Sequence, residues 1–171
     1  MAPSATSEPG IRVGYGRDSH PFGPGAPLRL GGLEFPGAGR LYGHSDGDVA
    51  LHAVAGALLS AAALGDLGSL FPADARTRRG IASDELLRDV VGRLDAAGWQ
   101  PVTVSVLVVA ARPRLGPRLE SMRSAIAGLL GLGTGAVSVD AGTGNLSGDD
   151  GAGRTISATA VATIRAVGAD A

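Results

Sequence analysis

Two of the three histidines lie close together, in the segment HSDGDVALH that spans residues 44–52. Its acidic and glycine residues are typical of a helix start, where a carboxylate caps free backbone N–H groups at the positive end of the helix dipole. We expect Asp46 to be that cap. The Ala- and Leu-rich run from Val49 to Leu64 predicts the helix itself. Because residues four apart share a helix face, Asp48 and His52 are expected on one side.

A second segment, GYGRDSH at residues 14–20, carries the third histidine. Asp18 and His20 are two residues apart, so extended backbone directs both side chains to the same side. With His52 they make a three-ligand site for a divalent metal ion, with a fourth position open to water or substrate, and this donor set suits Zn²⁺. In the alternative reading Asp18 caps a turn, His20 lies on a loop surface and His52 is in the core. Spacing alone does not separate the two.

Composition limits the classes of protein and partner. With 171 residues, of which 44% are hydrophobic and 18% charged, we assign residues 11–168 to a single domain and residues 1–10 to a disordered arm. A net charge of -1 argues against a nucleic acid partner. The longest apolar run is too short to span a bilayer, so we expect a soluble, cytoplasmic protein without a membrane partner.

Two residue types are missing from the sequence, which contains neither cysteine nor lysine. A disulfide framework, a thiolate nucleophile and cysteine-bound metal are therefore excluded, as are a lysine Schiff base and an ordinary Walker A motif. Any metal site must use His and Asp. Any phosphate clamp must use arginine or backbone N–H groups.

Hydrophobic periodicity predicts the elements that position these residues. The strands are expected at residues 11–15, 101–111, 136–139 and 155–167, a hairpin at 28–35, and further helices from Ser83 and from Pro117. We expect Ser83 to be a helix cap, the valine-rich strand at 101–111 to be buried on both faces, and the alternating strand at 155–167 to be half exposed. These elements indicate an α+β fold, an α/β sandwich with a mixed four-stranded core sheet and three helices on one face. The uncovered face indicates an oligomer.

Two connections have compositions that fit either a functional or a plain role. Residues 65–80 lack regular periodicity and end in arginines, which fits a lid but also a solvated surface turn. Residues 142–151 are rich in glycine and could bring N–H groups to a phosphate, although any flexible hairpin tip has the same composition.

Three motifs together resemble a known family. They are GxGxDxH at residues 14–20, HSDGDVxLH at 44–52, and AAALGDLG at 61–68 followed by LFP at 70–72. This combination closely resembles the 2-C-methyl-D-erythritol 2,4-cyclodiphosphate synthases, over about residues 11–167. The resemblance implies a homotrimer with active sites between adjacent subunits and a zinc ion, or a similar divalent metal, on Asp18, His20 and His52.

The resemblance also implies a reaction and residues for it. The 2-phosphate of a cytidine diphosphate ester of methylerythritol attacks the β-phosphorus, which expels CMP and closes a 2,4-cyclodiphosphate for isoprenoid precursor synthesis. The protein's task is then positioning and charge neutralisation, without a protein nucleophile. By resemblance, His44 and Ser45 hold the methylerythritol phosphate end, and Asp66 and Gly68 bind the polyol. We take His44 and Asp66 as catalytic residues, and Ser45 and Gly68 as substrate-binding residues.

The second half of the chain departs from the family pattern. Arg112-Pro113-Arg114 stands where the family has Ala-Pro-Lys for cytidine, and Thr143-Gly144-Asn145 stands where it has Thr-Thr-Glu. We assign Arg112, Arg114, Thr143 and Asn145 to substrate binding. Because an amide is a poorer ligand than a carboxylate, the second ion of the family, Mg²⁺ or Mn²⁺, is not expected to bind well here. Two other functions stay open: a divergent paralogue acting on another nucleotide or diphosphate ester, and a non-catalytic zinc- and ligand-binding trimer.

Overall fold

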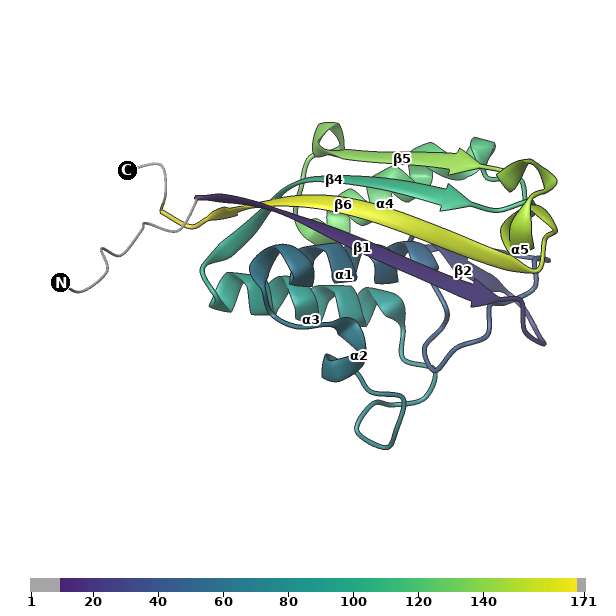
Figure 1. The fold of residues 1–171 in the computed structure, drawn as a ribbon, viewed down its shortest axis with the longest axis horizontal. Helices are drawn as coiled ribbons and strands as arrows, with labels where there is room; N and C mark the ends of the chain where they lie inside the picture. The colour runs from purple at the N-terminus through teal and green to yellow at the C-terminus, as the bar shows by residue number, and fades with distance from the viewer. Residues whose placement is uncertain (1–9, 169–171) are drawn as a thin grey trace.

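The computed structural model describes residues 10–168, in which a four-stranded sheet carries its helices on one face (Figure 1). The sheet order is β1-β6-β4-β5, with β1 (Ile11–Pro21), β6 (Thr155–Ala166), β4 (Trp99–Val109) and β5 (Val137–Gly142). The covering helices are α1 (Val49–Ala62), α3 (Ser83–Ala96) and α4 (Leu119–Leu130). The smaller elements are β2 (Leu28–Leu30), β3 (Leu33–Phe35), α2 (Leu67–Leu70), α5 (Gly148–Gly151) and 3₁₀ turns at Gly116–Arg118, Thr134–Ala136 and Gly144–Leu146. The predicted N-terminal arm, residue 10 excepted, lies outside the described residues.

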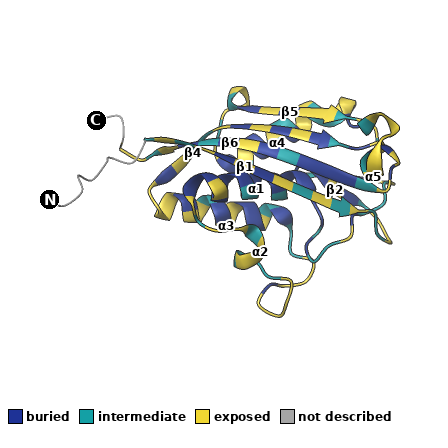
Figure 2. Cartoon of the chain, in the orientation of Figure 1, coloured by how far each residue is buried: buried dark blue, intermediate teal, exposed yellow. Residues whose placement is uncertain are grey.

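The sheet is mixed, as the sequence predicts. Strands β4 and β5 are parallel and the other pairs antiparallel. The alternation of β6 is confirmed, because its apolar positions from Ile156 to Ile164 are buried against the helices. The prediction that the valine-rich strand is buried on both faces is wrong: β4 alternates between buried and exposed residues (Figure 2). The exposed positions Thr103, Ser105 and Leu107 alternate with the buried valines, so the high valine content reflects one buried face and not two.

Strand β1 is longer than predicted and lies directly against α1. A Cβ atom added at Gly14 would lie 2.0 Å from the carbonyl oxygen of Ala57, and one at Gly16 would lie 2.1 Å from that of Ala53. The two backbones therefore touch, with no room for a side chain between them. This contact explains why glycines occur inside a strand, and it sets the distance between the residues on β1 and those on α1.

The cap of α1 is Asp48, not Asp46 as predicted. Its Oδ1 accepts from the N–H groups of Ala50 and Leu51, both at 3.1 Å. Its carboxylate also accepts from Gly31 N–H at 2.8 Å and Gly32 N–H at 2.7 Å, at the turn of the predicted β2–β3 hairpin. The carboxylate is thus turned into the protein, where it joins that hairpin to the start of α1.

The other helix starts also differ in detail. Ala82 is the N-cap of α3, and Ser83, the predicted cap, is its first residue. The hydroxyl of Ser83 is hydrogen-bonded to Asp46 and so is not available for capping. Pro117 lies in a 3₁₀ turn, after which α4 begins at Leu119. Within residues 10–168, no helix has the length and apolar character needed to cross a membrane.

Candidate functional site

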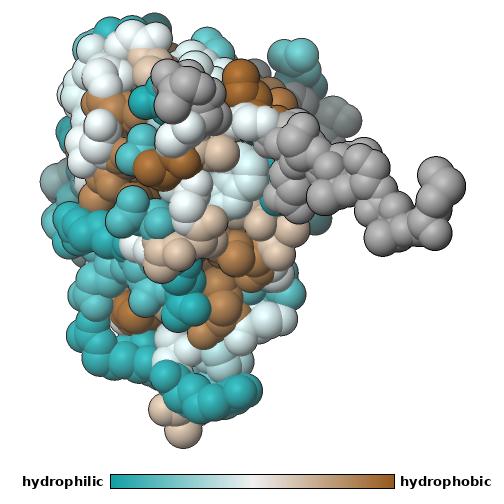
Figure 3. All heavy atoms as spheres, turned by 90° about the vertical axis from the view of Figure 1, so that its left-hand side faces the viewer, coloured by the Kyte–Doolittle hydropathy of each residue, from teal (hydrophilic) through white to brown (hydrophobic). Residues whose placement is uncertain are grey.

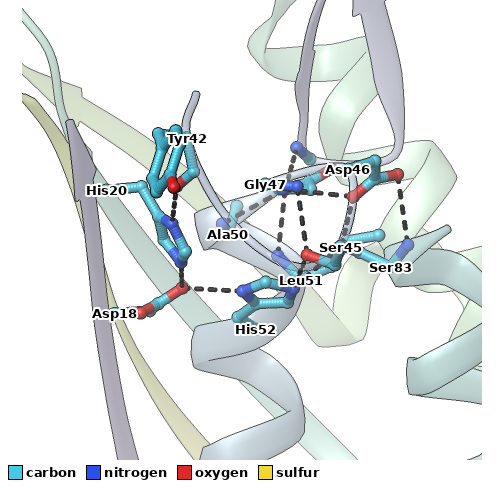
Figure 4. A network of polar contacts seen from close by, with 12 residues as sticks. Asp18, His20, Tyr42, Ser45, Asp46, Gly47, Ala50, Leu51, His52 and Ser83 are labelled. Carbon is cyan, nitrogen blue, oxygen red and sulfur yellow. Dashed lines mark hydrogen bonds and ion pairs between the residues drawn. The ribbon is translucent and has the colours of Figure 1, made fainter. Parts of the chain in front are cut away.

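The structure brings together the three residues predicted to bind metal. Asp18 and His20 project from β1 toward α1, and His52 comes from the first turns of α1 (Figure 4). Asp18 Oδ2 lies 2.9 Å from His20 Nε2 and 2.7 Å from His52 Nδ1. One ligand atom from each residue lies within 4.8 Å of the other two, and this is the one such His and acid group among the described residues.

The hydrogen bond that His20 makes away from the cluster decides which of its ring nitrogens carries the proton. The other nitrogen then has a free lone pair toward the cluster. Nδ1 lies 2.5 Å from the carbonyl oxygen of Tyr42. A carbonyl only accepts, so Nδ1 carries the proton and donates it. In the neutral ring Nε2 then directs its lone pair at Asp18, another electron donor, and a cation between the two removes the repulsion. The donor set therefore fits a divalent metal ion.

Mutual interactions shift the pKa values of two cluster residues in the metal-free protein. Burial alone would raise the pKa of Asp18, but the hydrogen bonds from His20 and His52 outweigh it and hold this pKa well below its ordinary value. The hydrogen bond to Asp18 raises the pKa of His20, against the opposing effect of burial. Asp18 is therefore ionised near neutral pH and could serve as an anionic ligand.

A cavity of about 250 Å³ opens beside the cluster. His20 and His52 form part of its wall, together with the predicted residues His44, Ser45 and Gly68. The lining is completed by Thr77 and by apolar side chains, namely Leu67, Phe71, Ala73, Ile81 and Leu86. The structure thus places most of the first-half site residues around one hollow with a polar side and an apolar side.

The connection at residues 65–80 forms the rim of this cavity and is anchored to it. His44 Nε2 donates to the carbonyl of Thr77 at 2.8 Å, and Gly80 N–H donates to the carbonyl of His44 at 2.7 Å. The connection also contains α2, which the sequence did not predict. Asp66, predicted to be catalytic, caps α2 by accepting from Ser69 N–H at 2.9 Å and Ser69 Oγ at 2.6 Å. These hydrogen bonds lower the pKa of Asp66, and its side chain is not part of the cavity lining.

The four predicted substrate-binding residues of the second half lie elsewhere in the chain, following β4 and β5. Arg112 stacks over Phe22, with its guanidinium carbon 4.7 Å from the ring centroid, and donates to the carbonyl of Gly153. Asn145 has a left-handed backbone, with φ 49° and ψ 42°, which asparagine tolerates better than most residues. The other two are Arg114 and Thr143. None of the four lines the cavity beside the metal cluster.

Two residues that the sequence indicates only as helix caps, Asp46 and Ser83, are linked to the cluster by hydrogen bonds. In the structure Ser83 Oγ lies 2.9 Å from His52 Nε2 and is hydrogen-bonded to Asp46. Ser83 and Asp46 are 37 residues apart, so no local spacing rule could have joined them.

Comparison with known proteins relates this geometry to a family. The YgbB family profile matches residues 11–165. The chain belongs to this family. It is 46% identical over 151 residues to the 2-C-methyl-D-erythritol 2,4-cyclodiphosphate synthase of Chromobacterium violaceum, covering 88% of this chain and 96% of that one. It is 47% identical over 152 residues to the enzyme of the same name from Symbiobacterium thermophilum, covering 89% and 97%.

A solved structure of a 2-C-methyl-D-erythritol 2,4-cyclodiphosphate synthase in its CDP-bound form also resembles this YgbB-family chain. The two share 35% identity and a TM-score of 0.78, over 90% of this chain and 99% of that one. The family resemblance drawn from the three motifs is therefore confirmed, and so is the mixed α+β fold.

Proposed function

We propose that this YgbB-family protein converts a CDP-methylerythritol 2-phosphate into the 2,4-cyclodiphosphate, with release of CMP, in isoprenoid precursor synthesis. The observation that carries the proposal is the cluster of Asp18, His20 and His52 on the wall of a cavity that also presents His44 and Ser45. The names of the relatives support the same reaction.

In the proposed reaction an oxygen of the 2-phosphate forms a bond to the β-phosphorus of the same molecule. The bond from that phosphorus to the bridging oxygen breaks, and CMP leaves with the electron pair. A divalent ion, in our proposal Zn²⁺, held by Asp18, His20 and His52 would supply positive charge for the diphosphate oxygens. The chain itself holds the substrate bent, so that its two phosphates meet, and His44 and Ser45 line the space for one end.

The second half of the site is proposed to come from a neighbouring subunit in a homotrimer. The uncovered face of the sheet carries exposed apolar side chains on neighbouring strands, because Tyr15 pairs with Val161 and both are exposed, as are Val13 and Leu107. At the end of the molecule where β1 begins and β6 ends, apolar groups occur as separate patches among hydrophilic ones (Figure 3). Packing the sheet faces around a threefold axis would bury the apolar strand residues and bring Arg112, Arg114, Thr143 and Asn145 to another subunit's cavity.

Light scattering at micromolar concentration tests the assembly. We expect the mass of three chains. A monomer would contradict the trimer, and the four predicted substrate-binding residues of the second half would then have no neighbouring cavity to line.

The reaction is tested by incubating the zinc-loaded protein with the cytidine substrate and following cyclic diphosphate and CMP by phosphorus NMR. Wild type should form both products, and His52→Ala should form neither. Failure of wild type to react, with zinc bound and the trimer intact, would rule out this substrate. That outcome would favour the paralogue acting on another diphosphate ester, which Asn145 in place of the family's glutamate also favours.

A further inference from the structure

The side of His52 that faces away from the metal cluster is held by a chain of side-chain hydrogen bonds (Figure 4). Its Nε2 lies 2.9 Å from Ser83 Oγ and 3.0 Å from Ser45 Oγ. The Ser83 hydroxyl is in turn hydrogen-bonded to Asp46 Oδ1. Asp46 is fixed by two backbone groups, since its carboxylate accepts from Asp48 N–H at 3.3 Å and from Ser83 N–H at 3.1 Å.

The donor and acceptor roles in this chain follow from the chemistry of each group. A carboxylate oxygen only accepts, so the single hydroxyl proton of Ser83 is donated to Asp46. Ser83 Oγ then has only lone pairs to offer His52, and the proton between them must belong to Nε2. Ser45 Oγ already accepts from Gly47 N–H at 3.1 Å and can accept from Nε2 as well.

We propose that Asp46 and Ser83 are positioning residues that hold the proton of His52 on Nε2 and so keep the Nδ1 lone pair free for the metal ion. This inference rests on the proposed metal site. Both cluster histidines would then have one ring N–H held by an acceptor and the other nitrogen free for the metal ion. In His20 the held nitrogen is Nδ1, which donates to the Tyr42 carbonyl. The acceptor for His20 is backbone, whereas the acceptor for His52 is a side-chain pair that substitution can change.

Changing Asp46 should shift the preferred position of the His52 ring proton from Nε2 toward Nδ1. In Asp46→Asn a neutral amide replaces the charged acceptor and holds the Ser83 hydroxyl less strongly. That hydroxyl can then turn and donate to Nε2, which moves the ring proton to Nδ1, where it competes with the metal ion. In Ser83→Ala the acceptor itself is lost, although Ser45 remains. Ser83→Thr keeps the hydroxyl and should restore the wild-type behaviour.

Zinc affinity measured against a competing chelator provides the first test. We expect Asp46→Asn and Ser83→Ala to bind Zn²⁺ about 10- to 100-fold more weakly than wild type, the usual effect of removing a partner of a metal-bound histidine. Ser83→Thr should stay close to wild type. Ser157→Ala is the matched control, because Ser157 is also buried and donates to a carboxylate, that of Asp150 at 2.5 Å, but it does not contact the cluster.

Histidine ¹⁵N NMR provides a second readout that lost stability alone would not change. In zinc-loaded wild type the proton of His52 should be on Nε2 and should exchange slowly with water, because it is held between Ser83 and Ser45. In Ser83→Ala and Asp46→Asn that proton should exchange faster. Zinc-loaded wild type with the His52 proton on Nδ1 would overturn the inference even if the variants failed to fold. Equal losses of zinc affinity in Ser157→Ala and Ser83→Ala would also overturn it. If wild type bound no zinc, the proposed metal site itself would fail, whereas zinc binding unchanged in every variant would remove only the roles of Asp46 and Ser83.

Discussion

Replacing Gly16 by alanine should separate α1 from β1 and damage the metal cluster without touching a ligand. The new Cβ would lie 2.1 Å from Ala53 O and 2.5 Å from Ala57 N. Ordinary contacts of this kind are longer by 1 Å or more, and the atoms in the way are backbone, so α1 must move by roughly 1 Å. Overpacking of this kind costs about 1–3 kcal/mol, and we expect the upper end because no side chain can rotate aside.

The same displacement reaches the metal site directly. Asp18 is two residues beyond Gly16 on β1, and His52 is next to Ala53 on α1. Binding sites tolerate errors of only about 0.5 Å in ligand placement. Zinc affinity should therefore fall by at least about tenfold, together with stability.

The opposite side of this contact offers a matched control. A Cβ atom at Gly56 on α1 would lie 3.6 Å from Gly16 Cα, an ordinary contact. Gly56→Ala should therefore be neutral, or more stable by up to about 1 kcal/mol through the higher helix propensity of alanine. Denaturant unfolding and zinc competition would be measured on both variants. If Gly16→Ala unfolded within about 0.5 kcal/mol of wild type and kept its zinc affinity, the idea that backbone contact sets the ligand spacing would be wrong.

Three further predictions concern single side chains. Asp48→Ala should lose about 2–4 kcal/mol in chemical unfolding, because it leaves several buried N–H groups without an acceptor, while Asp48→Asn, which keeps one acceptor oxygen, should lose less. In metal-free protein the raised pKa of His20 means that the folded state holds its proton more tightly than the unfolded state does. The stability that the protonated His20 contributes is therefore complete below its ordinary pKa of 6.5 and is lost as pH rises through the raised value. The Tm measured with a chelator present should fall over this pH window, and His20→Gln should lack that fall. His52→Ala should retain no stoichiometric zinc by metal analysis, and full retention would refute the ligand assignment.

The sequence was most informative where one short segment determines a local structure. The alternation in β6 and the paired glycines between β2 and β3 predicted the strand and hairpin that the structure shows. The two-residue spacing of Asp18 and His20 correctly placed both on one side of an extended segment. The end of β1 was misjudged because glycines normally weaken a strand, whereas here they make room for α1.

Contacts between distant segments could not be predicted in this way. Asp46 and Asp48 are equally good caps in the sequence, and only the position of the β2–β3 turn, with its free N–H groups, selects Asp48. The link from His52 through Ser83 to Asp46 depends on how α3 packs against α1. The assignment of Arg112 and Asn145 to substrate binding came from family resemblance, and in a single chain neither residue lines the cavity.

The pairing of β1 with β6 has a consequence for when the metal centre can form during synthesis. Strand β1 is an edge strand, and its one neighbour in the described sheet, β6, is the last strand to be made. The two pair from Ile11 opposite Arg165 to Pro21 opposite Thr155, a register that includes Asp18 and His20. A nascent chain that has not yet emerged through β6 therefore holds these ligands on an unpaired segment. The metal ion should accordingly be acquired after the ribosome has completed this sheet, and a ribosome stalled before β6 should display a chain with little zinc affinity.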